Sequence, residues 1–230
     1  MRRLLLATAL VAWAAGAAVA QDTLPVPPAG GWFWDARPYT AWTPAELLQF
    51  FTDSPWSRSA SLVEPGMQLT LGGPRYFVQW YSAQTMREAL VRRRQLRPEY
   101  DPQGSADFLA APHDSYQIYI YAALVTADGS LRIVPPDLFE GMKEGDIVQG
   151  ARLQFSAQEF AGRPDKVEFV RDPVTHELRG VRLTFERVRA SVPPERAPSG
   201  RVQFTCPTSR GSLSAGFTLS DMHRNGQPDL

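Results

Sequence analysis

The chain offers few residues that could carry chemistry, and they form no recognised catalytic pattern. It has three histidines, His113, His176 and His223, and a single cysteine, Cys206. His113 precedes Asp114 in a polar segment, and loops carry function more often than cores do. Zinc sites usually show clustered ligands such as His-Glu-x-x-His. Because this spacing does not occur in the sequence, we expect no metal and no cofactor.

Two other chemical signals have structural explanations. Cys206 is in phase with Val202 and Phe204, so we expect a buried thiol on the core face of a strand. Residues 211–216 resemble a hydrolase elbow, but Ser212 stands where Gly-x-Ser-x-Gly requires glycine. The segment also alternates like a strand, so we reject it as a nucleophile site.

A short motif, Asp53-Ser54-Pro55-Trp56, follows a strong helix signal. Thr43 can cap that helix, Pro44 suits its first position, and Glu46 can complete a capping box. The residue before proline is pushed out of the helical region, so the helix should end here. We expect Asp53 or Ser54 to bond nearby backbone and Trp56 to pack under the sheet.

Aromatic and basic residues suggest two possible surfaces. Five tryptophans after the first 20 residues fall in the first third of the remaining chain, and they either form an exposed stacking platform or seal the helices onto the sheet. We favour sealing. A cluster of five arginines between residues 87 and 97 either binds an anionic partner or forms a solvated helix face. These residues are Trp32, Trp34, Trp42, Trp56 and Trp80, and Arg87, Arg92, Arg93, Arg94 and Arg97.

The N-terminus has the three parts of a secretory signal in order. Arg2 and Arg3 precede an apolar run over residues 4–15, and Ala-Val-Ala ends at Ala20, before Gln21. The run is shorter than the roughly 20 residues that span a bilayer. We therefore expect cleavage, no transmembrane segment, and a periplasmic or secreted product. Removing two arginines changes the net charge from 0 to −2, which gives no attraction to nucleic acid.

The remaining chain divides into a Pro- and aromatic-rich leader, residues 21–41, which we expect to be extended, and one globular domain, residues 42–230. A second helix should cover residues 83–94, capped by Ser82. Residues 97–115 are polar and contain Pro and Gly, so we expect a loop.

From residue 116 onward the apolar period changes from 3.6 to 2. Before that point, residues 67–71 and 75–81 suggest a hairpin. Residues 116–126 suggest a central strand, and residues 128–129 suggest a tight turn that leads into another strand at residues 131–134. Residues 135–143 suggest a short helix or turn, and residues 189–200 a Pro-rich loop. Later apolar residues alternate as in half-buried antiparallel strands. They are Leu153, Phe155, Val167, Phe169, Val181, Leu183, Phe185, Val202, Phe204, Leu213, Ala215, Phe217 and Leu219. The predicted fold is a β-rich α+β protein, a mostly antiparallel sheet or sandwich with two N-terminal helices.

Several of these segments together resemble a family of uncharacterised exported proteins from acidobacteria. The likeness lies in residues 42–56 with their Asp-Ser-Pro-Trp motif, in residues 78–83, in Arg-Glu-Ala at residues 87–89, and in Phe-Thr-Leu-Ser-Asp-Met at residues 217–222. The sequence departs from the family at residues 227–229, so we do not predict a final strand. The resemblance implies kinship and export, and it supplies no activity.

These observations favour a non-enzymatic binding or envelope-associated module with a macromolecular or envelope partner. The alternative is a hydrolase whose site is assembled from distant residues. Its candidates are Asp53, His113, Asp114, Asp221 and His223.

Overall fold

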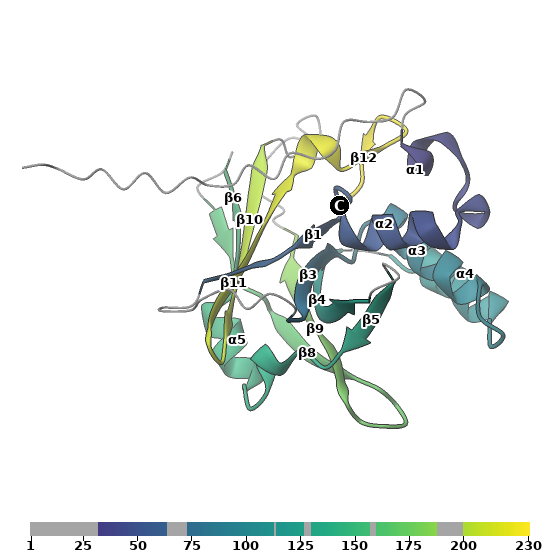
Figure 1. The fold of residues 1–230 in the computed structure, drawn as a ribbon. Helices are drawn as coiled ribbons and strands as arrows, with labels where there is room; N and C mark the ends of the chain where they lie inside the picture. Colours follow the sequence, from purple (N-terminus) through teal and green to yellow (C-terminus); the bar gives the residue numbers. More distant parts are fainter. Residues whose placement is uncertain (1–31, 64–72, 113, 127–129, 157–159, 188–199) are drawn as a thin grey trace, which may run out of the picture.

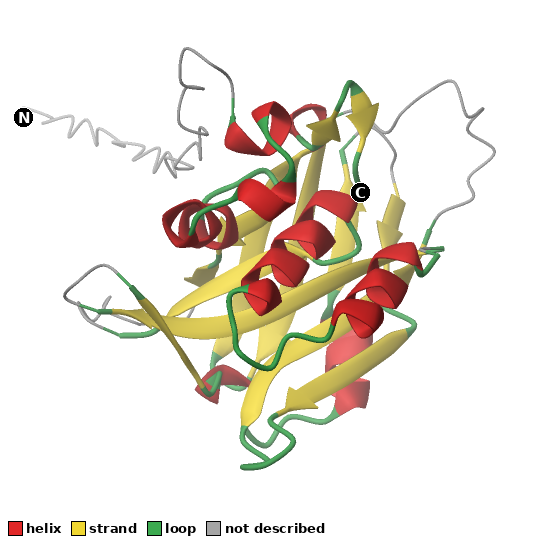
Figure 2. Cartoon of the chain, turned by 90° about the vertical axis from the view of Figure 1, so that its right-hand side faces the viewer, coloured by secondary structure: helices red, strands yellow, loops and turns green. Residues whose placement is uncertain are grey.

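Two antiparallel sheets pack face to face, and helices lie beside the outer face of one of them (Figures 1 and 2). The computed structural model describes residues 32–63, 73–112, 114–126, 130–156, 160–187 and 200–230. The signal segment with Ala20 and Gln21, the strand at residues 67–71, His113, the turn at residues 128–129 and the Pro-rich loop up to residue 199 lie outside the described residues. The predicted β-rich α+β fold is confirmed.

The larger sheet has six strands in the order β1-β3-β4-β9-β8, with β5 also paired to β4. The long strand predicted at residues 116–126 is confirmed as a central one, because β4 pairs with β3 on one side and β9 on the other. The strands are β1 (Ser57–Ser59), β3 (Arg75–Trp80), β4 (Ser115–Val125), β5 (Leu131–Val134), β8 (Lys166–Arg171) and β9 (Leu178–Glu186).

The smaller sheet has the order β2-β11-β10-β6-β7, and a separate two-stranded ribbon pairs β12 with β13. Around Ala60 the chain passes from β1 in one sheet to β2 in the other. The ribbon places a short strand at Gln227–Pro228, where the sequence predicted none. The strands are β2 (Ser61–Val63), β6 (Arg152–Phe155), β7 (Phe160–Gly162), β10 (Arg201–Thr208), β11 (Gly211–Thr218), β12 (His223–Arg224) and β13 (Gln227–Pro228).

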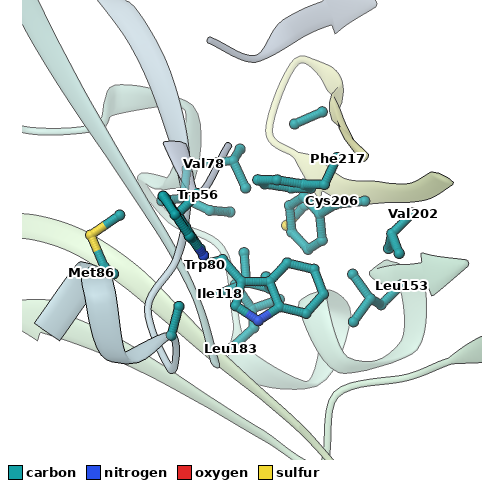
Figure 3. Close-up of a cluster of buried hydrophobic side chains, with 14 of the residues drawn as sticks. Trp56, Val78, Trp80, Met86, Ile118, Leu153, Leu183, Val202, Cys206 and Phe217 are labelled. Carbon is teal, nitrogen blue, oxygen red and sulfur yellow. The ribbon is translucent and has the colours of Figure 1, made fainter. Parts of the chain in front are cut away.

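The core lies between the two sheets, as the alternating pattern predicts (Figure 3). Ile118 and Leu183 of the larger sheet meet Val202 of the smaller one within one cluster of buried residues. Trp80 contacts Phe217 edge to face, with ring centroids 5.4 Å apart. Aromatic pairs of this geometry add about 0.5–1.5 kcal/mol beyond their buried area.

The first long helix, α2 (Pro44–Thr52), has the predicted capping box. The backbone N–H of Thr43 donates to Glu46 Oε2 at 2.8 Å, and the Glu46 N–H donates to Thr43 Oγ1 at 3.3 Å. Before it, α1 (Phe33–Ala36) and a 3-10 turn (Tyr39–Ala41) replace the extended segment that we expected there.

The second helix, α3 (Gln84–Gln95), is present as predicted, but Ser82 does not cap it. The N-cap position is Ala83, which has no capping side chain. Asp229 takes this role from the end of the sequence, because its carboxylate accepts from the N–H of Gln84 at 2.6 Å and of Thr85 at 2.9 Å. A carboxylate at this position accepts hydrogen bonds from two backbone N–H groups that have no partner within the helix. Its negative charge also interacts favourably with the positive end of the helix dipole.

The predicted loop at residues 97–115 is wrong, because α4 (Pro102–Ala110) lies within it. Asp101 caps this helix by accepting from the N–H of Gly104 at 3.1 Å, and proline at the first position favours the helical φ angle. A 3-10 turn (Asp137–Phe139) confirms the short helix or turn expected at residues 135–143. The sequence pattern did not predict α5 (Glu144–Gly150) or the 3-10 turn Leu219–Asp221.

The tryptophans mainly pack the helices against the sheets. Trp34, Trp42, Trp56 and Trp80 are each at most 2% exposed, and half-buried Trp32 stacks on Trp34 at 4.6 Å. An exposed platform of tryptophans is therefore wrong. The sealing role is confirmed.

Trp56 lies where these contacts converge. Its ring stacks on Phe50 at 5.6 Å, and its indole N–H donates to the Asp229 carbonyl at 2.8 Å. The predicted packing of this residue is confirmed. Asp229 thus holds both Trp56 and the start of α3.

Replacing Asp229 with alanine should destabilise the fold by about 0.5–2 kcal/mol, the usual effect of losing an N-cap. Asp229→Asn should lose less stability, because its one side-chain oxygen can still accept a hydrogen bond from the start of α3. Urea unfolding of the purified variants measures this, with exposed Asp221→Ala as a control expected within about 0.5 kcal/mol of wild type. An Asp229→Ala variant as stable as wild type would contradict the capping role.

Trp56→Ala should reduce the free energy of unfolding by about 3–5 kcal/mol, since it leaves a cavity and an unpaired carbonyl. The same unfolding measurement on Trp32→Ala, at a half-buried site, should show a smaller loss. A fully stable Trp56→Ala protein that had lost ligand binding would show that Trp56 serves a surface instead.

Candidate functional site

A groove of about 140 Å³ opens between α3 and the outer face of the six-stranded sheet. In Figure 2 the helices lie in front of this sheet. Apolar side chains of α3, β5 and β8 form part of the wall, together with the Gln79 amide. The other lining residues are three tyrosines and three arginines, Tyr81, Tyr119, Tyr121, Arg93, Arg94 and Arg182.

The tyrosines face outward because β4 alternates. Ile118 and Ile120 lie in the core, so Tyr119 and Tyr121 lie on the opposite face. The rings of Tyr119 and Tyr121 are 6.1 Å apart and within 18° of parallel, and Tyr81 lies 5.7 Å from Tyr119. The result is a row of aromatic rings along the groove.

Gly180 in β9 leaves space for the Tyr119 ring. A Cβ atom at this position would lie 2.4 Å from the Tyr119 hydroxyl and 2.5 Å from the Ile120 carbonyl oxygen. Backbone cannot yield as a flexible side chain can, so a larger residue would displace both β4 and the ring. The glycine therefore fixes where Tyr119 lies.

The three tyrosine hydroxyls differ in their partners. Tyr121 donates to the Phe51 carbonyl at 3.0 Å, which ties the end of α2 to the sheet. The hydroxyls of Tyr81 and Tyr119 form no hydrogen bond with any residue that the structure describes. Both therefore retain a donor and acceptor capacity for a ligand.

Arg93 is the half-buried arginine of the groove lining that has no acidic partner among the described residues. Its guanidinium lies 4.7 Å over the Phe51 ring and is half-buried. It makes no hydrogen bond or ion pair with any described residue. Burial lowers its pKa, yet an arginine stays charged at neutral pH.

The two other groove arginines are already engaged or exposed. Arg182 donates to Glu168 Oε2 at 3.0 Å. Arg94 is exposed and lies 5.0 Å over the Phe108 ring. The lining formed by the described residues therefore brings together three guanidinium groups and no carboxylate, an arrangement suited to an anion.

Tyr119 and Tyr121 remain neutral over the physiological range. Burial and the neighbouring Tyr81 raise the pKa of Tyr119 to about 12, against the opposite effect of Arg93, Arg182 and Arg179. Burial also raises the pKa of Tyr121. These groups offer hydrogen bonds and ring faces, whereas a general base at neutral pH would need a pKa near 7.

The residues that the sequence singled out do not line this groove. Asp53 is exposed at the end of α2, and Arg58 Nη1 lies 3.8 Å from its carboxylate. Ser54 is buried, and its hydroxyl finds no partner among the described residues. The hydroxyl of Ser57 bonds the Phe51 carbonyl. Ser54 bonds nearby backbone through its own N–H, which donates to the Ser57 carbonyl at 3.2 Å, and not through its hydroxyl. Asp114 is exposed just before β4.

The described members of the hydrolase constellation do not bond one another. Ser220 Oγ donates to Asp221 Oδ1 at 3.3 Å, and His223 Nδ1 lies 3.0 Å from the Ser220 carbonyl oxygen. Within the described ranges, no three His, Cys, Asp or Glu side chains are grouped to hold a metal. Asp53, Asp114, Asp221 and His223 thus show no assembled site.

Sequence reasoning missed most of the groove, although one signal was available. The arginine cluster is one of the features for which the sequence leaves an anionic partner open, and Arg93 and Arg94 belong to it. The sequence pattern places Tyr119 and Tyr121 in a strand that is apolar on both faces, as a covered central strand would be. Neither pattern could show that α3 lies over these tyrosines.

Comparisons with known proteins give no relative. No protein-family model matches the chain, and neither curated proteins nor solved structures contain a significant match. None of the helices in the described part of the chain is long and apolar enough to cross a membrane.

The raised pKa of Tyr119 predicts a loss of stability at high pH. An unfolded tyrosine ionises near pH 10, so between about pH 10 and 12 the unfolded chain has lost a proton that folded Tyr119 retains. The stability that the folded state gains from neutral Tyr119 is fully present below about pH 10 and is lost as the pH rises through about 12. Urea unfolding at pH 9 and 11 should show a smaller decline for Tyr119→Phe than for wild type. Equal declines would contradict the assignment.

Proposed function

We propose that this protein is an exported, non-enzymatic binding module, and that the tyrosine–arginine groove is its binding site for an anionic ligand. It works in the periplasm or outside the cell, where the ligand belongs to the envelope or to another macromolecule. The observation that carries this proposal is the half-buried Arg93 guanidinium without an acidic partner among the described residues.

An unpaired charge held partly out of water is unfavourable unless a partner replaces its hydration. Arg93 keeps this position through its contact with the Phe51 ring, which is worth about 0.5–2 kcal/mol at most such sites. An incoming carboxylate, sulfate or phosphate would supply the missing charge-assisted hydrogen bonds. The site is therefore prepared for an anion before the anion arrives.

Export is supported by the order of charge, apolar run and Ala-x-Ala in residues 1–20. The resemblance of the Asp-Ser-Pro-Trp segment to exported acidobacterial proteins points the same way. A single buried cysteine is also compatible with an oxidising compartment, since it leaves no exposed thiol to react.

Anions that occupy the groove should raise the melting temperature of the wild-type protein and leave that of Arg93→Met unchanged. At 100 times Kd, binding adds about 2.7 kcal/mol, equivalent to several degrees for a domain of this size. Thermal unfolding with acetate, benzoate, glucuronate, sulfate and phosphate in turn measures this.

Arg97→Met is the matched control, because Arg97 is an exposed arginine of the same cluster that does not line the groove. It should retain most of the anion effect. The protein recovered from the periplasm or medium should begin at Gln21. The proposal fails if no anion stabilises the wild type, or if Arg93→Met responds equally.

A further inference from the structure

The charge available to a ligand in the groove is close to a single positive charge. Glu168 binds Arg182 at 3.0 Å and also lies 3.3 Å from Lys166 Nζ. Arg94 is exposed, so water screens it. Among the groove residues, Arg93 is the half-buried cation without an acidic partner in the described part of the chain. A carboxylate matches one guanidinium in charge and in its two-pronged geometry, whereas a phosphate dianion exceeds it.

The walls favour a flat ring beside that anion. Tyr119 and Tyr121 lie within 18° of parallel, and Leu90, Ile133 and Val170 add apolar surface. The free volume of about 140 Å³ is well below the 300–1,000 Å³ of pockets for drug-sized ligands. The groove is therefore suited to one ring at a time.

The free hydroxyls distinguish a sugar from an aromatic acid. Tyr81 and Tyr119 line the groove, and neither hydroxyl has a protein partner among the described residues. A polyhydroxylated ring can bond both, while a bare aromatic ring would leave both unpaired and lose the energy of those bonds. A sugar ring also presents C–H faces that can pack on tyrosine.

From the unpaired guanidinium, the parallel tyrosine rings and the two free hydroxyls, we infer that the groove binds a carboxylated sugar ring, a hexuronate. This inference rests on the proposed function and names its ligand class. The carboxylate bonds Arg93, one face of the sugar packs on the tyrosine row, and ring hydroxyls bond Tyr81 and Tyr119.

Titration calorimetry of the purified protein with glucuronate and galacturonate tests this, with glucose, benzoate and inorganic phosphate as comparison probes. Both uronates should bind and glucose should not, because it lacks the carboxylate. Benzoate should bind at least tenfold more weakly than the uronates, because it lacks the hydroxyls.

Three conservative variants test the geometry. Arg93→Lys keeps the charge but loses the planar fork, and should weaken uronate binding at least tenfold. Tyr119→Phe removes one hydroxyl and should weaken it about three- to tenfold. Arg97→Lys, an exposed position outside the groove lining, is the control and should change affinity less than threefold. Circular dichroism establishes that each variant is folded.

The free sugar and the end of an acidic polysaccharide carry the same chemistry. A galacturonate trimer that binds much more tightly than the monomer, still through Arg93, indicates a polysaccharide. Equal affinities indicate the free sugar. Either outcome supports the hexuronate.

The failures of the two proposals are distinguishable. Binding of benzoate or phosphate through Arg93, without uronate binding, overturns the hexuronate and leaves the anion groove standing. Equal binding of glucose and glucuronate overturns the role of the carboxylate. Absence of any Arg93-dependent binding overturns both proposals.

Discussion

The arrangement of the helices depends on one residue, Asp229, which bonds in two directions at once. Its carboxylate holds the first N–H groups of α3, and its carbonyl accepts the indole N–H of Trp56. The α3 helix begins at this contact and continues to Arg93, so the cap also positions the groove. A second bond, from Arg187 to the Leu230 carbonyl at 2.5 Å, holds the same end of the sequence. The groove is therefore assembled from residues far apart in the chain.

Local chemistry explains which parts of the fold could be predicted. The capping box of Thr43 and Glu46 involves neighbouring residues, and strand alternation needs only a two-residue period. The Asp229 cap could not be foreseen, because its partners lie about 145 residues away. The α4 helix differs from the predicted loop although Asp101 and Pro102 form a helix start, because a polar segment with Pro and Gly is also typical of a loop.

The candidate site shows the same division between local and distant information. A run of arginines on a helix indicates positive charge, but it does not tell which arginine will line the groove half-buried, without an acid beside it among the described residues. Burial separates them here. Arg87 is 1% exposed, Arg93 is half-buried, and Arg94 is exposed. The partner of Arg182, Glu168, lies on the adjacent strand, and strand register becomes known only from the fold.

The buried Cys206 thiol allows the opening of the two sheets to be measured by chemical labelling. Cys206 is fully buried on the core face of β10, and burial raises the pKa of its thiol, so the reactive thiolate is scarce in the native state. A thiol reagent must wait until the two sheets separate. The rate of labelling under native conditions therefore reports how often the sandwich opens, without any introduced probe. With one thiol in the chain, every labelled molecule records an opening at the same place.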